Sequence, residues 1–159
     1  MSIKRMVLAA IVPALLAGLM FAAPAAADPV AAATYTFTVK AVPTDNCPSS
    51  SYPCTISDSW DGTVFQKDSG GVGVKIAAYK NGVLAAKVEF HPYDEHLYVY
   101  DTLADGLGIK ARVSGYDDPF PARSQGYNLY DLDIRDGRNL VVSLMVSDGT
   151  GRNTNTAFA

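Results

Sequence analysis

The chain has few of the residues that mark the common hydrolases and nucleic-acid-binding proteins. It holds two histidines, two cysteines and one tryptophan in 159 residues. Only His91 and His96 are available as the base of a Ser–His–Asp hydrolase, and no serine stands in a G-x-S-x-G elbow. A formal net charge of −3 without a basic cluster argues against binding to nucleic acid or an anionic membrane by bulk charge.

Sustained helical periodicity is also missing after residue 33, and alternation of apolar and polar residues takes its place. Such alternation, interrupted by turn residues, predicts about eight short strands. They fall at residues 34–41, 62–65, 72–79, 84–90, 95–101, 107–113, 127–134 and 139–147. We therefore predict an all-β domain over residues 34–148, a single antiparallel β-sandwich, with a small β-barrel as the alternative. Residues 28–33 are predicted to be a loose tail, and residues 149–159 a polar tail that frays unless Phe158 docks.

The clearest pattern is the hairpin at residues 72–90, which turns at Asn81-Gly82. Even-numbered residues on both predicted strands are apolar, whereas odd-numbered positions include Lys75, Lys87 and Glu89. A two-residue turn would pair even positions with odd ones and bury charge. We therefore predict a three-residue loop, Lys80 to Gly82, which places Lys75 opposite Lys87 on a solvated face.

The N-terminus has the three parts of a secretory signal peptide. Lys4 and Arg5 precede an apolar stretch at residues 6–21, and Ala25 to Ala27 forms a small-residue cleavage site before Asp28. The alternative, an uncleaved membrane anchor, is disfavoured by the A-x-A site and by Pro13. We predict removal of residues 1–27 and a secreted, extracellular domain with no membrane contact after cleavage.

The two cysteines lie close together, at Cys47 and Cys54, and Pro48 and Pro53 stand just inside them. In an exported chain this arrangement predicts a structural disulfide. The spacing is not C-x-x-C and no histidine is adjacent, so a redox pair or a metal site is disfavoured. The loop they enclose, stiffened by two prolines, is the element that an inhibitor would present to a protease.

Carboxylates in the segment 131–137 suggest a calcium site. Asp131 and Asp133 share one face of a predicted strand, and Asp136 sits in the turn beyond it. The alternative is a soluble acidic turn, because Leu132 and Ile134 are core-type residues at strand spacing. The chain therefore predicts no cofactor, with calcium at these carboxylates as the alternative.

An aromatic stripe is the better candidate for function. If Leu97 and Val99 face the core, the residues alternating with them form an outward row that suits sugar rings or a protein partner. The alternative is that this row packs inside a second interface. The candidate ligand-binding residues are His96, Tyr98, Tyr100 and Trp60.

Two turn-and-strand pieces in the second half of the chain are characteristic. Residues 101–106 (DTLADG) precede the predicted strand 109–113, and residues 136–140 (DGRNL) lead into the strand 141–146. In these pieces the chain resembles a group of uncharacterised small secreted actinobacterial proteins with an alanine-rich signal peptide. No function comes with the resemblance.

Together these features favour a secreted, non-enzymatic binding domain. Its expected ligand is a cell-wall glycan or an extracellular protein. Two alternatives remain: a secreted protease inhibitor that presents the Cys47–Cys54 loop, and a small secreted hydrolase.

Overall fold

The computed structural model describes residues 35–47, 65–147, 149 and 151–159, all of which belong to one compact unit, Ala32–Ala159. These residues form strands and turns, with two short 3-10 turns at Thr44–Asn46 and Tyr93–Glu95. The strands are β1 (Tyr35–Pro43), β2 (Val72–Lys80), β3 (Val83–His91), β4 (His96–Asp101), β5 (Ile109–Val113), β6 (Phe120–Pro121), β7 (Gly126–Asp131), β8 (Asn139–Val146) and β9 (Gly151–Phe158). Within the described part of the chain, no helix has the length and apolarity needed to cross a membrane.

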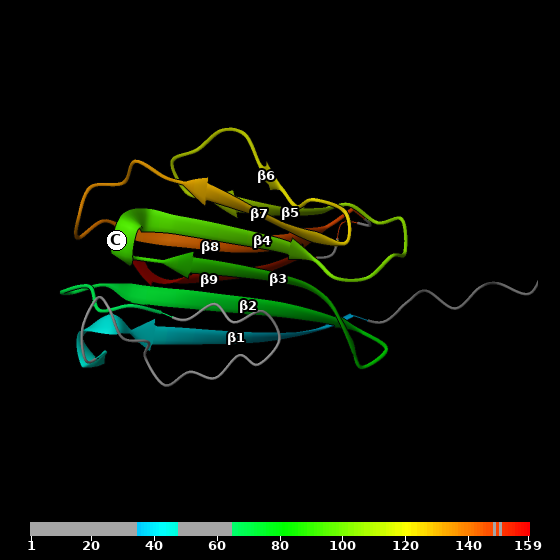
Figure 1. Ribbon diagram of the computed structural model, residues 1–159, viewed down its shortest axis with the longest axis horizontal. Coiled ribbons are helices and arrows are strands. Elements are labelled where there is room, and N and C mark those ends of the chain that lie inside the picture. The colour runs from blue at the N-terminus through cyan, green and yellow to red at the C-terminus, as the bar shows by residue number, and fades with distance from the viewer. Residues whose placement is uncertain (1–34, 48–64, 148, 150) are drawn as a thin grey trace, which may run out of the picture. The chain divides into compact units, whose positions relative to one another are not determined.

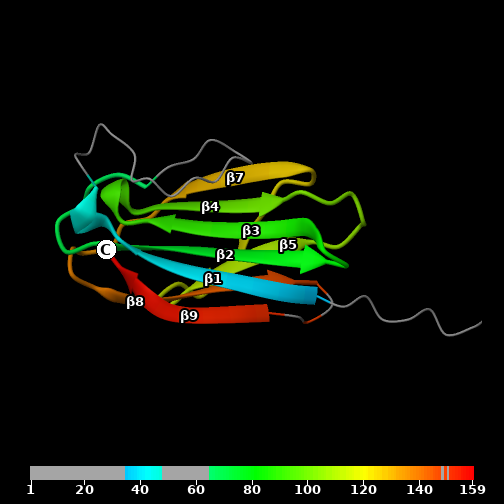
Figure 2. The ribbon, with the colours of Figure 1, turned by 90° about the horizontal axis from the view of Figure 1, so that it is seen from below.

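The strands form one antiparallel sheet in the order β6-β5-β8-β9-β2-β3-β4-β7, and β1 also pairs with β2. Strands β1, β2, β3, β4 and β7 lie side by side in one layer (Figure 1; Figure 2). Among the described residues, β9 pairs with this layer at Val72–Phe158, and the sheet folds back at that point. β8 then contacts β2 and β3, and β5 contacts β4. The predicted all-β class is confirmed, as two facing layers that approach a closed barrel.

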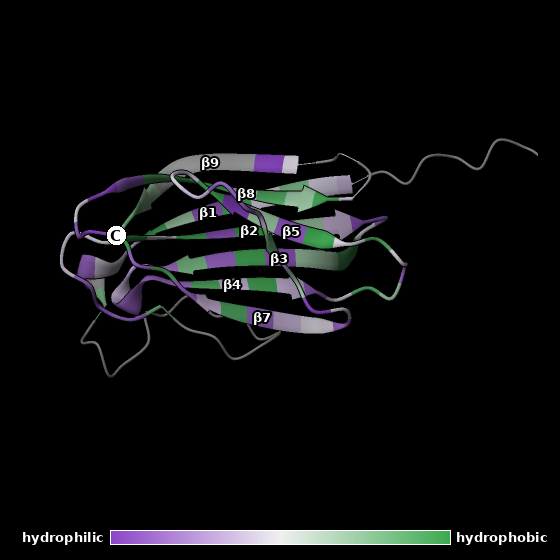
Figure 3. Ribbon diagram, turned by 90° about the horizontal axis from the view of Figure 1, so that it is seen from above, coloured by the Kyte–Doolittle hydropathy of each residue, from purple (hydrophilic) through white to green (hydrophobic). Residues whose placement is uncertain are grey.

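One hydrophobic core lies between the two layers. It is built from the inward residues of β2, β3 and β4 on one side and of β5 and β8 on the other. The alternation that predicted these strands is visible along them in Figure 3. Leu132 and Ile134 follow β7 and still point inward, as their spacing predicts. Strand β8, flanked by β5 and β9, is central in its layer.

The hairpin confirms the predicted faces but not the predicted turn. Val74 pairs with Phe90 and Ile76 with Val88, so even positions do face even positions. The turn, however, has two residues, because Lys80 pairs directly with Val83. Asn81 (φ 51°) and Gly82 (φ 83°) both adopt the left-handed conformation that a type I′ turn requires. A bulge, rather than a longer turn, brings even-numbered residues opposite even-numbered ones. The register shifts between Ala78 and Tyr79, which leaves Ala85 as the extra residue on β3.

The expectation of a solvated face on this hairpin is wrong. With the observed register, Lys75 lies opposite Glu89 rather than opposite Lys87. Lys87 is 1% exposed and Glu89 is fully buried. The charged residues therefore compensate one another inside the protein instead of being hydrated separately.

The C-terminal segment also differs from its prediction. Residues 151–158 form β9, which pairs with β8 over most of its length. Ala157 is buried, and the main-chain N–H of Ala159 donates a hydrogen bond to the carbonyl of Arg138. The expected polar tail is thus a strand of the sheet, in which Phe158 pairs with Val72. The predicted signal peptide (1–27) and N-terminal tail (28–33) lie outside the described residues.

Candidate functional site

The outer face of the β2-β3-β4-β7 layer is the most unusual surface of the molecule. By outer face we mean the residues of these strands that point away from the hydrophobic core. Phe65 covers one end of it, in a small second core with Val42 and Cys47. A Cβ atom at Gly73 would lie 2.5 Å from Phe65 Cδ1, so glycine is what lets the ring settle onto β2.

A buried carboxylate organises the middle of this face. The Oε1 atom of Glu89 lies 2.6 Å from Lys75 Nζ and 2.9 Å from Lys87 Nζ. Its Oε2 atom lies 3.0 Å from His91 Nε2. We call these four residues the Glu89 network. Alternation on β3 places Lys87, Glu89 and His91 on one face, and the cross-strand register brings Lys75 to them.

His91 is held between aromatic rings at the edge of this network. Its ring stacks on Phe65 at 4.4 Å between centroids and lies 4.9 Å from the ring of Tyr98. Burial lowers the pKa of His91 below its ordinary value, although the hydrogen bond and charge of Glu89 act in the opposite direction. The fold therefore favours a neutral imidazole at this position.

Three tyrosines continue the outer face across β4 and β7. The rings of Tyr98 and Tyr100 stack at 6.2 Å, and Tyr127 on β7 lies 6.0 Å from Tyr98 and 5.1 Å from Tyr100. Lys87 Nζ lies 4.4 Å from the centroid of the Tyr100 ring, within cation–π range. The Glu89 network and the tyrosines are therefore one continuous cluster.

Exposure increases along this cluster toward β7. Tyr100 is 1% exposed, Tyr98 is half-buried, and Tyr127 is 53% exposed. Leu129, which pairs with Tyr98 across the strands, is 45% exposed. Burial raises the pKa of Tyr98, with smaller contributions from Tyr127 and from the charge of Glu89, so its hydroxyl stays protonated. We call Tyr98, Tyr127 and Leu129 the tyrosine platform.

The structure brings three of the four predicted ligand-binding residues onto one face. His96, Tyr98 and Tyr100 do share a side of β4, and Leu97 and Val99 are buried in the core on the other side. Tyr100 is buried. His96 is half-buried, and its ring lies edge-on to that of Tyr98, with 6.2 Å between the centroids. Trp60 lies outside the described residues.

Sequence reasoning missed the part of the platform on β7. Alternation predicts that Tyr130, Leu132 and Ile134 are inward residues. Extending it back along the chain assigns Tyr127 and Leu129 to the outer face, and the exposed and half-buried positions of β7 follow that pattern. The contact between Tyr127 and Tyr100 depends on the pairing of β4 with β7, which no local pattern specifies.

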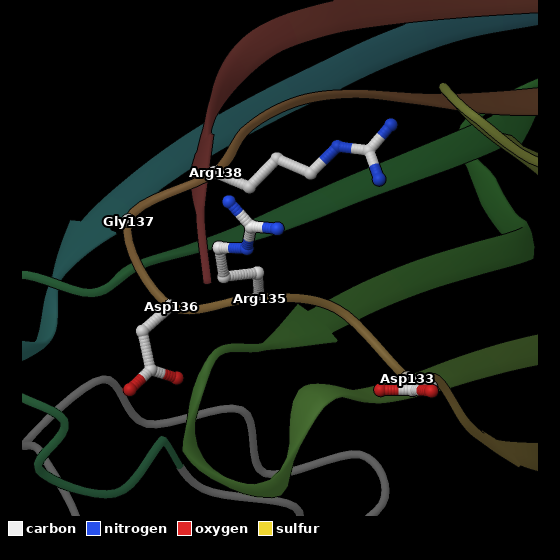
Figure 4. A pocket seen from close by; sticks show the side chains of 5 residues that line it. All are labelled: Asp133, Arg135, Asp136, Gly137 and Arg138. Atoms are coloured by element: carbon white, nitrogen blue, oxygen red, sulfur yellow. The ribbon is translucent and has the colours of Figure 1, made fainter.

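The proposed calcium ligands are not assembled into a site. Asp131 ends β7, Asp133 follows it and Asp136 lies in the turn before β8. Within the described ranges, no group of three or more His, Cys, Asp or Glu side chains could hold a metal ion. Asp133 and Asp136 instead line an open cleft of about 680 Å³ with Arg135, Gly137 and Arg138. In Figure 4 the two arginine side chains lie near each other, and Asp136 points away from them.

Carboxylates are concentrated at the end of the sheet where this turn lies. Burial raises the pKa of Glu95, and the charges of Asp136 and Asp68 raise it further. The pKa of Asp68 is likewise raised, first by burial and then by the charge of Asp136. The negative charges of these carboxylates therefore act on one another at this end of the sheet.

The predicted disulfide falls only partly within the described residues. Cys47 is buried beside Val42 and Phe65, under the outer face. Its expected partner Cys54 lies outside the described residues, as does the whole loop between them, residues 48–53. The pairing therefore stays a prediction.

No known family model matches the chain, and no curated protein or solved structure matches it either.

Proposed function

We propose that the protein is a non-enzymatic carbohydrate-binding domain whose ligand stacks on the tyrosine platform. One observation carries this proposal: Tyr127 presents more than half of its surface to solvent next to the exposed Leu129 and the half-buried Tyr98. A tyrosine ring offers a flat apolar face and a hydroxyl at one edge. A sugar ring likewise offers an apolar face of C–H groups and polar edges, so the two chemistries match.

The size of the platform favours a sugar over a protein partner. A stable protein interface buries about 800 Å² on each side and centres on several anchor residues. The platform has two exposed apolar side chains, Tyr127 and Leu129, which is enough to cover one or two sugar rings. Polar groups surround it, because His96 and Asp131 are paired at one end of the two strands and Arg123 bridges to Tyr100 near the other.

Fixed rings suit this role because stacking needs a rigid surface. Tyr98 and Tyr127 contact each other and rest on Tyr100, whose ring is in turn held over the Lys87 ammonium. Binding therefore orders few side chains, which reduces its entropic cost. The predicted signal peptide at residues 1–27 would place this face outside the cell, where a wall polysaccharide is the expected partner. The resemblance to small secreted actinobacterial proteins belongs to the same proposal.

The test is co-sedimentation of the purified protein with a panel of insoluble polysaccharides and isolated cell walls. We expect retention on at least one of them. Tyr127→Ala removes the exposed ring and should lower the affinity about tenfold, the scale of one aromatic contact with its buried area. Val83→Ala is the matched control, since Val83 is 57% exposed at the hairpin turn, away from the platform, and should bind as the wild type does.

The outcomes separate the proposal from its competitors. Retention that is lost in Tyr127→Ala and kept in Val83→Ala supports it. Equal retention of all three proteins would reject the platform as the binding surface. If no polysaccharide retains the protein but a soluble extracellular protein does, the carbohydrate assignment is wrong.

A further inference from the structure

Strand β7 leaves one edge of the sheet open. It is the last strand in the sheet order and pairs with β4 on one side; no other described strand pairs with it (Figure 2). The N–H of Leu132 donates to the carbonyl of Glu95 at 3.2 Å, which continues the β4–β7 register. Because hydrogen-bonded residues alternate in antiparallel pairs, the main-chain groups of Tyr127 and Leu129 point away from β4. Among the described residues no strand pairs with these groups, so they form an open hydrogen-bonding edge.

This edge lacks several of the features that usually prevent strands from associating. Natural edge strands are shortened, carry proline or lysine, or contain a bulge. β6, at the opposite end of the sheet order, has two residues and one of them is Pro121. β7 has six residues, GYNLYD, with no proline and no lysine, and its register with β4 is continuous. Of the two ends of the sheet order, β7 is therefore the less protected, and it also carries exposed apolar side chains.

We infer that β7 pairs with β7 of a second copy of this chain, antiparallel and about a two-fold axis at Asn128. A closed dimer of this kind uses the same patch on both subunits. Placing the axis at Asn128 sets Tyr127 of one copy opposite Leu129 of the other, twice. The outward main-chain groups of these residues then exchange hydrogen bonds, and both exposed apolar side chains gain an apolar neighbour.

Charge at the two ends of β7 supports this arrangement. The strand ends at Asp131, with Asp133 just beyond, whereas the turn before it carries Arg123 and Gln125. All four side chains are exposed. Antiparallel pairing brings the acidic end of one strand to the turn of the other. Parallel pairing would place Asp131 beside its own copy, which is destabilising. The chemistry of the edge thus selects a second copy in a single direction.

The dimer joins two tyrosine platforms into one surface. Side chains of Tyr127 and Leu129 point to the outer face, whereas the dimer forms through main-chain groups in the plane of the sheet. A second copy would therefore extend the platform rather than cover it. Dimer formation does not depend on the proposed binding of carbohydrate, and it is measured without any sugar.

The test is sedimentation velocity of the purified protein from micromolar to near-millimolar concentration. We expect the wild type to shift from monomer toward dimer. Leu129→Pro removes an N–H that points away from β4, so the ladder to β4 is kept while the edge is blocked. Leu129→Lys is the second variant, which places an edge lysine while leaving the main chain unchanged. Both should be monomeric, and Val83→Lys, a lysine at an exposed apolar site elsewhere, should dimerise as the wild type does.

Cross-linking then measures the register. With the axis at Asn128, the two copies of this residue face each other in a non-hydrogen-bonded pair, close enough for a disulfide. Asn128→Cys should give a covalent dimer under mild oxidation, and Val83→Cys should not. A wild type that stays monomeric throughout, or a dimer that survives both Leu129 variants, overturns the inference. Equal cross-linking of the two cysteine variants overturns the register, and a partner protein captured through β7 without self-association overturns the choice of occupant.

Discussion

Replacing Glu89 with glutamine tests whether the Glu89 network holds the outer face together. The substitution keeps the shape of the side chain and removes its charge. In the wild type, one carboxylate oxygen contacts Lys75 and Lys87 within 3 Å, and the other contacts His91. The glutamine can still accept from the lysines through its oxygen and donate to a neutral His91 through its nitrogen. What is lost is the attraction between opposite charges in a buried site.

The magnitude follows from burial. The side chains of Lys87 and Glu89 are each 1% exposed, whereas that of Lys75 is 11% exposed. Removing one partner of a buried ion pair typically costs about 3–5 kcal/mol, because it leaves a charge without compensation in a poorly solvated place. A domain of this size is stable by about 5–15 kcal/mol, so the variant should fold but unfold at much lower denaturant concentration.

The assay is equilibrium unfolding in urea, with near-ultraviolet circular dichroism as the signal from the tyrosines. Glu89→Gln should lower the free energy of unfolding by about 3–5 kcal/mol. Lys75→Met should lower it less than Lys87→Met does, since Lys75 is the more exposed lysine. The double variant Lys87→Met with Glu89→Met should be more stable than Glu89→Gln, because it leaves one fewer buried charge. A loss below about 1 kcal/mol in Glu89→Gln would mean that the pair is solvated like a surface ion pair, and the reasoning would fail.

Two further predictions concern acid sensitivity and the junction of β1 with β2. Because the fold lowers the pKa of His91, stability from the neutral imidazole is complete above about pH 6.5 and falls as the pH drops below that value, where the unfolded chain takes up the proton. His91→Gln should flatten the fall in melting temperature between about pH 6.5 and pH 5, and an unchanged slope would contradict this assignment. The hydroxyl of Thr44, fully buried, lies 2.8 Å from the carbonyl of Gly71, to which it donates a hydrogen bond. Thr44→Val should therefore cost about 1–2 kcal/mol in urea unfolding, while Thr38→Val on the exposed side of β1 should cost almost nothing.

The alternation of residues made most of the fold predictable. Period-two patterns placed β1, β4, β5, β7 and β8 close to their observed bounds and separated core residues such as Leu97 and Val99 from outward ones. The hairpin shows where this reasoning stops. Pairing even-numbered residues with even-numbered ones requires one extra residue in the hairpin, and either a longer turn or a bulge supplies it. The chain uses a bulge at Ala85, and no residue there distinguishes the two solutions, since alanine fits both.

Polar composition gave a wrong prediction for the C-terminal segment and for the outer face, because strand pairing determines the structure of both. Residues 151–158 are polar, yet their main chain pairs with β8, and apolar residues at the far end anchor the strand. On the outer face, lysine and glutamate on odd positions normally indicate solvent. Here the register sets Lys75 opposite Glu89, and this compensation is what permits burial. A pattern within one strand cannot reveal a partner on the next.

The candidate site depends on this compensation. Glu89 holds Lys87, Lys87 lies under the ring of Tyr100, and Tyr100 contacts Tyr127. Each step is a direct contact, and exposure rises from a buried carboxylate to an open ring. A hydrophobic substitute for the charged residues would fill the same volume, but it would not fix the direction of Tyr100 through a cation over its face. The network is therefore best understood as the support that keeps the tyrosine platform rigid at the edge where we infer that a second copy joins.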